Sequence, residues 1–98
     1  MSMNNFDSIS LNKEKKLIEN KKINEIVKNI VNDCMKQIRF YHTNGCSKFL
    51  YDIPILYYNL NYNDPEYIEN ILLKVKQILQ NKKFNVMYIF PYKLIIEW

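Results

Sequence analysis

The stretch from Phe84 to Trp98 limits the possible folds more than any other part of the chain. Apolar residues occupy alternate positions on both sides of the short segment "PYK": Phe84, Val86, Tyr88, Phe90, Leu94, Ile96 and Trp98. A period of two is typical of β-strands, and two such runs joined by a short turn predict a β-hairpin. Because a lone hairpin is only marginally stable in water, the rest of the chain must supply a further strand and a covering layer.

A third strand is predicted in "SKFLYDIPI", residues 47–55. Pro54 ends this strand or confines it to a sheet edge, because proline has no N–H to donate to a ladder. Within it, one set of side chains alternates with another: Phe49, Tyr51 and Ile53 against Leu50 and Asp52.

Two segments have the three- and four-residue spacing of amphipathic helices. The first follows residues 1–10, which we predict to be a flexible arm, and ends at "HTNG"; its apolar stripe is Ile23, Ile26, Val27, Ile30, Val31, Cys34, Met35 and Ile38. The second begins with Asp64 as N-cap and Pro65 at the first helical position. Its stripe is Ile68, Ile71, Leu72, Val75, Ile78 and Leu79. We therefore predict one α+β domain over residues 11–98, with both helices on one face of a small three-stranded, mainly antiparallel sheet that ends in a C-terminal β-hairpin.

The composition indicates an intracellular protein. No stretch approaches the roughly 18 consecutive apolar residues of a membrane span, and the first ten residues lack the basic start and apolar core of a signal peptide. Cys34 and Cys46 have no CxxC spacing, which favours reduced thiols over a disulfide. We expect no membrane partner.

Residues that could perform chemistry are sparse. His42 is the only histidine and precedes Cys46 by four positions, but zinc requires about four ligands, so a loop histidine without a metal is favoured. A chain with one glycine cannot form a glycine-rich phosphate loop. We predict that the protein is not an enzyme and has no cofactor, no metal and no small-molecule substrate.

The second face of the hairpin is apolar too, where a solvated sheet would have polar groups. We expect it to be covered by residues 1–10, by "LYYNLNY" (residues 56–62), or by a partner. Tyrosine is enriched in protein interfaces because it offers a large, stiff and amphipathic surface. The predicted protein interface, with another protein or in a homo-oligomer such as a dimer, consists of Met87, Ile89, Ile95, Tyr92, Tyr57 and Tyr58.

Nucleic-acid binding is the alternative. Residues 1–48 contain nine Lys or Arg against five acidic residues. A possible nucleic-acid face would consist of Lys13, Lys15, Lys16, Lys21 and Lys22, although glutamates are interspersed among them. A platform for single strands would mix tyrosines with lysines, whereas here they occupy different halves of the chain. Protein association is therefore favoured.

The last two-thirds of the chain contains a spaced set of prolines, aromatic and aliphatic residues: Pro54, Pro65, Tyr67, Phe84, Val86, Tyr88, Pro91, Leu94, Ile96 and Trp98. In these residues the chain resembles a family of small uncharacterised proteins encoded by nucleocytoplasmic large DNA viruses. The chain departs from the family pattern at three positions, with Lys83 in place of glycine, Tyr92 in place of asparagine and Glu97 in place of serine. The resemblance implies a viral protein of the host cytoplasm or the virion, without any catalytic residue to carry over. On this basis we expect a binding or assembly module, with an accessory role in viral transcription or genome packaging as the nucleic-acid alternative.

Overall fold

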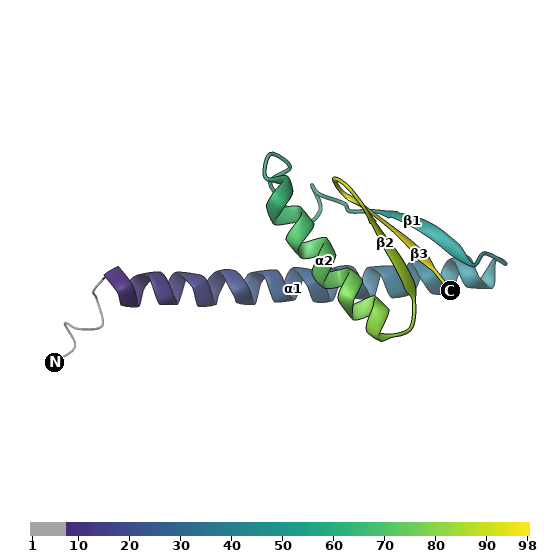
Figure 1. The fold of residues 1–98 in the computed structure, drawn as a ribbon, viewed down its shortest axis with the longest axis horizontal. Coiled ribbons are helices and arrows are strands. Elements are labelled where there is room, and N and C mark those ends of the chain that lie inside the picture. The colour runs from purple at the N-terminus through teal and green to yellow at the C-terminus, as the bar shows by residue number, and fades with distance from the viewer. Residues whose placement is uncertain (1–7) are drawn as a thin grey trace.

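The computed structural model describes residues 8–98 and has two helices and a three-stranded sheet (Figure 1). In chain order the elements are α1 (Ser8–Thr43), β1 (Lys48–Asp52), α2 (Pro65–Asn81), β2 (Asn85–Ile89) and β3 (Lys93–Glu97). The predicted α+β fold with a C-terminal hairpin is confirmed.

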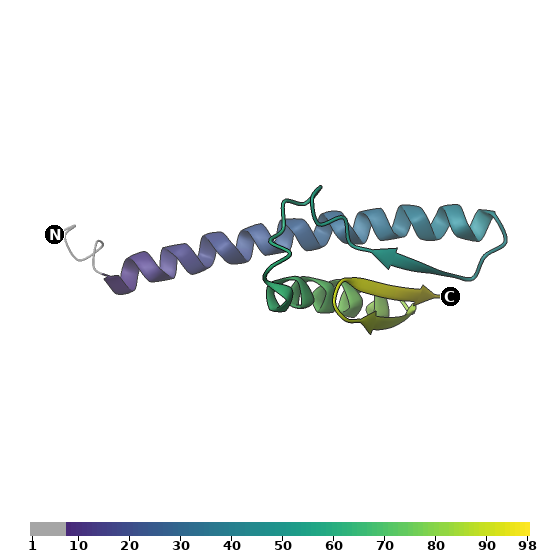
Figure 2. The ribbon, with the colours of Figure 1, turned by 90° about the horizontal axis from the view of Figure 1, so that it is seen from above.

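The sheet has the order β1-β3-β2, so the last strand is the central one and pairs antiparallel with both neighbours. The two helices lie on the same face of this sheet, with β1 beside α1 and the hairpin beside α2 (Figures 1 and 2). Side chains of the inner face enter the core, as the alternation predicts: Phe49, Tyr51, Leu94 and Ile96 are all buried. The opposite, outer face holds the other residues of each strand.

Helix α2 begins as its sequence predicts. The Asp64 carboxylate accepts a hydrogen bond from the Tyr67 backbone N–H at 3.2 Å, and Pro65 occupies the first turn, where no N–H is needed. Five of its six stripe residues are buried against α1 and the sheet: Ile68, Ile71, Leu72, Val75 and Leu79. The chain leaves the helix through Lys83, whose φ of 75° lies in the left-handed region that glycine usually occupies.

Helix α1 is 36 residues long, and only its C-terminal part packs against the domain. Its buried residues begin at Val27, whereas every residue from 11 to 22 is exposed, so this part projects into solvent (Figure 1). The molecule is accordingly elongated, with extents of 64 × 27 × 20 Å. Helix α1 ends at Thr43, and Gly45, with φ of 85°, supplies the left-handed backbone that commonly follows a helix end. Asn44 Nδ2 donates to the Phe40 carbonyl at 2.8 Å.

The start of α1 corrects one prediction. A flexible arm was expected over residues 1–10, but residues 8–10 are the first turn of α1. Residues 1–7 lie outside the described part of the chain.

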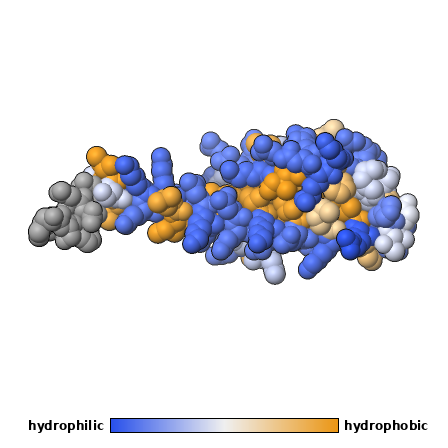
Figure 3. Space-filling view, turned by 90° about the horizontal axis from the view of Figure 1, so that it is seen from below, coloured by the Kyte–Doolittle hydropathy of each residue, from blue (hydrophilic) through white to orange (hydrophobic). Residues whose placement is uncertain are grey.

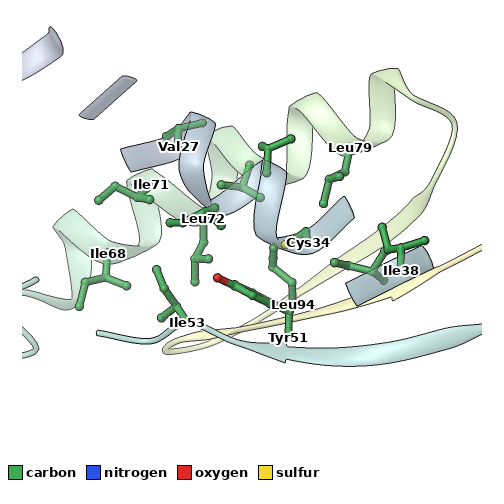
Figure 4. Close-up of a cluster of buried hydrophobic side chains, with 14 of the residues drawn as sticks. Val27, Cys34, Ile38, Tyr51, Ile53, Ile68, Ile71, Leu72, Leu79 and Leu94 are labelled. Carbon is green, nitrogen blue, oxygen red and sulfur yellow. The ribbon is translucent and has the colours of Figure 1, made fainter. Parts of the chain in front are cut away.

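The core lies between the helices and the inner face of the sheet. Figure 4 shows Tyr51 and Leu94 from the sheet facing Cys34, Leu72 and Leu79 from the helices. No polar or charged residue is classed as buried within residues 8–98.

Candidate interaction surface

An apolar row crosses all three strands on the outer face of the sheet. The register places Leu50 of β1 opposite Ile95 of β3, and Met87 of β2 opposite Ile95 from the other side. Leu50 is 52% exposed and Met87 is 61% exposed, while Ile95 between them is half-buried by its neighbours. We call Leu50, Ile95 and Met87 the outer row.

Charged residues border the outer row at both ends of the strands. On one side Lys48 lies opposite Glu97, and on the other Asp52 lies opposite Lys93. The strand β2 has no charge on this face, because its two remaining outer positions are Asn85 and Ile89. The outer face is therefore an apolar row between two rows that contain one positive and one negative residue each.

The segment 56–62 does not cover this face. It packs instead near the end of the hairpin, where Tyr92 Oη donates to the Tyr62 carbonyl at 2.7 Å and the Tyr92 carbonyl accepts from the Ile53 N–H at 3.1 Å. Leu50 and Met87 remain more than half exposed. The prediction that this connection could shield the apolar face is wrong.

Residues 1–7 of the same molecule cannot reach the outer row. Tyr51 shares the core with Cys34, which is 26 residues along α1 from Ser8. At 1.5 Å per residue this separation is about 40 Å, whereas seven fully extended residues span at most about 25 Å. Whatever covers the outer row must therefore come from another molecule or from chain outside these residues.

The tyrosines of the predicted interface lie elsewhere. Tyr57 and Tyr58 are in edge-to-face contact, with ring centroids 5.0 Å apart, and line a hollow beside α1. Tyr92 is half-buried and fixes the loop through its bond to Tyr62. Of the six predicted residues, the structure brings together only Met87, Ile89 and Ile95.

Leu50 is the interface residue that the sequence reasoning missed. Alternation along residues 47–55 already placed it opposite to Phe49 and Tyr51, hence on the outer face. What alternation could not supply is the register, which aligns Leu50 with Ile95 across the ladder.

The hollow beside Tyr57 and Tyr58 has a volume of about 550 Å³ and is mostly polar, with Asp33 and Lys36 on its α1 side. Behind it, the Tyr51 hydroxyl is buried near Asp33 and Tyr58, but makes no hydrogen bond of good geometry with any described residue. Burial, followed by the charges of Cys34, Tyr58 and Asp33, raises the pKa of Tyr51 above its usual range. The hydroxyl thus stays protonated at neutral pH and cannot serve as a base there.

His42 and the cysteines do not form a joint site. The predicted loop histidine lies in the last turn of α1, where its Nδ1 accepts a hydrogen bond from Trp98 Nε1 at 3.2 Å. Burial and then the nearby Asp33 charge raise the pKa of Cys34 to about 12, and Cys46 is an exposed free thiol. Within residues 8–98 no three His, Cys, Asp or Glu side chains cluster in a way that could hold a metal ion.

The five lysines of the possible nucleic-acid face all lie on the projecting part of α1, but they do not form a face. At about 100° per residue, Lys15 and Lys22 share one side of the helix, whereas Lys13 points to the opposite side. Lys16 and Lys21 lie between these two sides. Lys13 and Lys16, three residues apart, are also neighbours on the helix surface, so at most two or three of the five lysines can contact one straight phosphate backbone together.

A second apolar region lies on the helix side of the molecule. Seen from below, hydrophobic surface gathers where α1 meets the rest of the domain, while the projecting part of α1 is largely hydrophilic (Figure 3). One shallow groove here, of about 260 Å³, is formed mainly by Met35, Ile38 and Trp98. This groove is open to solvent along most of its surface.

The described part of the chain contains no helix that is both long and apolar enough to cross a bilayer. Comparison with known proteins found no matching family model, no matching curated protein and no matching solved structure.

Proposed function

We propose that this protein is a small binding or assembly module without catalytic activity, which binds another protein molecule through the outer face of its sheet. One observation supports the proposal most: the outer row is continuous across three strands and lies opposite both helices. Soluble monomers rarely leave a contiguous apolar patch exposed, and such patches usually mark interaction sites.

The chemistry of the buried groups favours a binding role over catalysis. Tyr51 and Cys34 keep their protons at neutral pH, because their ordinary pKa values of 10.0 and 9.0 already lie above it and burial raises both pKa values further. Neither group can therefore act as a base or as a thiolate nucleophile under those conditions.

The setting of this interaction follows from the viral resemblance alone. If the chain does belong with those proteins, its partner is to be sought in the cytoplasm of infected cells or in the virion.

A pair of double variants tests the proposed surface. Ile89→Lys with Ile95→Glu adds one charge of each sign to the outer face. The matched control, Leu56→Lys with Leu73→Glu, adds the same charges at exposed apolar positions away from the sheet. Thermal unfolding checks that both variants fold, and light scattering together with affinity capture measures assembly with the same chain or with another protein.

We expect the wild type and the control to form the same protein assembly, and the sheet variant to lose it. Two results would contradict the proposal: an assembly that survives in the sheet variant, or a wild-type protein that forms no protein assembly at all.

A further inference from the structure

We infer that the partner of the outer face is a second copy of this chain, stacked face to face about a two-fold axis that runs along the outer row. This inference rests on the proposed function, because it identifies the molecule that the same surface binds. It is drawn from the positions of four charged residues in the sheet: Lys48, Asp52, Lys93 and Glu97.

These positions form a simple pattern. Along β1 the charges are positive at Lys48 and negative at Asp52, and along β3 they are positive at Lys93 and negative at Glu97. The register places Lys48 beside Glu97 and Asp52 beside Lys93, with the outer row halfway between the two pairs. Reversing the strand direction therefore exchanges every positive position with a negative one.

A two-fold axis along the outer row performs this reversal. It stacks Lys48 on Asp52 of the second copy and Glu97 on Lys93 of the second copy, and each pair occurs twice. The apolar row meets itself: Leu50, Ile95 and Met87 all lie along the axis, and each stacks on the same residue of the second copy. All four charged positions are matched, and no charge faces an apolar side chain.

The other orientations of the axis are worse. An axis parallel to the strands would place Glu97 on Glu97 of the second copy and Lys93 on Lys93 of the second copy, in the centre of the interface. An axis along the diagonal would stack Glu97 on Leu50 of the second copy and would desolvate that carboxylate without a partner. Packed sheets normally keep their strands within about 30° of alignment, which long lysine side chains can accommodate.

The expected dimer is weak. A face of three five-residue strands is small compared with the roughly 800 Å² per partner of a standard interface, so we expect dissociation constants in the micromolar range or weaker. Symmetric pairing of a surface with itself is the commonest way in which soluble chains form dimers. The paired charges set the orientation more than the affinity, and their effect should weaken with salt.

The charge pattern allows a test by exchange. Lys48→Glu makes positions 48 and 52 both negative, so in a homodimer the new carboxylate of each subunit would oppose Asp52 of the other copy. Asp52→Lys makes both positions positive, with the same result. A mixture of the two variants restores every pair, and so does the double variant Lys48→Glu with Asp52→Lys.

Sedimentation equilibrium at low salt measures the outcome. We expect the wild type to approach twice the 11.9 kDa monomer mass as concentration rises. Each single variant should dimerise at least about ten-fold more weakly, and the mixture and the double variant should regain most of the lost affinity. Lys74→Glu, the same charge change on the exposed side of α2, should leave the wild-type constant unchanged. If Lys48→Glu or Asp52→Lys unfolds, Glu97→Lys and Lys93→Glu provide the same exchange on β3.

Three results would overturn the inference. One is a wild-type monomer up to about 1 mM, where even a weak specific contact would register. Another is dimerisation of each single variant at wild-type strength, which would instead indicate pairing through the uncharged edge strand β2. The third is a mixture that associates no better than its components. If the wild type is monomeric but binds a different protein that the Ile89→Lys, Ile95→Glu variant loses, the proposed function stands and only the second copy is excluded.

Discussion

The Tyr51 hydroxyl is the clearest energetic irregularity at the scale of single residues. The side chain is 2% exposed, and its hydroxyl lies near Asp33 and Tyr58 without a hydrogen bond of good geometry to any of residues 8–98. A buried polar group without a partner costs about 1–3 kcal/mol. The core therefore holds a polar group that its packing does not require.

Tyr51→Phe should raise the free energy of unfolding by about 1 kcal/mol at neutral pH, because it removes the unpaired hydroxyl and keeps the ring. The pH dependence has a definite sign. The pKa of Tyr51 is raised in the folded state, so the folded protein holds this proton more tightly than the unfolded chain does. This proton-linked contribution to the free energy of unfolding is complete below the ordinary tyrosine pKa of 10.0 and is lost as the pH rises above it. The variant should thus lose less stability than the wild type in alkali.

Denaturant unfolding on both sides of that pH measures the effect, with the exposed Tyr62→Phe as the control. A variant that is less stable than the wild type by more than about 1 kcal/mol at neutral pH would show that the hydroxyl is bonded in solution.

Lys83 is a second unfavourable residue, because its backbone has a positive φ that residues other than glycine rarely adopt. Its φ of 75° lies in the left-handed region, directly after α2, where glycine is the favoured residue. A side chain in the left-handed region costs roughly 1 kcal/mol relative to glycine. Lys83→Gly should therefore stabilise the protein by about that amount. The neighbouring Lys82, with φ of −89°, is the matched control, and Lys82→Gly should be neutral or destabilising. If Lys83→Gly lowered the free energy of unfolding, the backbone at this position would not be strained by the lysine side chain.

At the scale of the elements, α1 differs from the other four because a third of it touches nothing in the domain. Residues 11–22 are exposed on every side. Most side chains of this projecting part are polar or charged, and its apolar residues Leu11, Leu17 and Ile18 are exposed, so it has no buried stripe of the kind that normally anchors a helix. A contact through the outer face of the sheet therefore does not account for the projecting part of α1.

Nucleic-acid binding by this element should be weak. Since the five lysines divide between opposite sides of the helix, about two or three phosphates can be neutralised at once. The log–log slope of affinity for duplex DNA against salt should then be no steeper than about 3, with binding lost near physiological salt. Fluorescence anisotropy in a salt series measures this slope, with Lys15→Gln, Lys22→Gln compared against Lys74→Gln, Lys82→Gln. A slope of about 4 or more, or retention at physiological salt, would favour the nucleic-acid alternative.

The elements themselves were predictable because their signals are local. The Asp64-Pro65 start of α2, the stop of α1 within "HTNG" and the alternation around Phe49 all depend on neighbouring residues, and each appears in the structure as predicted. The site was predictable only in part. Met87 and Ile95 follow from alternation, but Leu50 and the positions of Tyr57 and Tyr58 depend on the strand register and on the path of the loop, which local patterns do not encode.

At the scale of the whole molecule, the two helices cover one face of the sheet and no element of residues 8–98 packs on the other. Both helices cover the inner face, residues 1–7 are too short to return, and the outer row stays open. An exposed apolar face on a two-layer fold is a surface on which a third layer can pack. In the arrangement inferred above, the sheet of a second copy is that layer.

Methionine-methyl NMR over a dilution series tests this account most directly. Met87 lies in the outer row and Met35 lies on the helix side, so the two methyl groups report on opposite faces of the same molecule. Between about 10 μM and about 1 mM the Met87 methyl resonance should shift or broaden while that of Met35 stays in place. A Met87 resonance that is unchanged over this range, or a Met35 resonance that moves instead, would contradict the assignment of the outer face as the surface through which this protein associates.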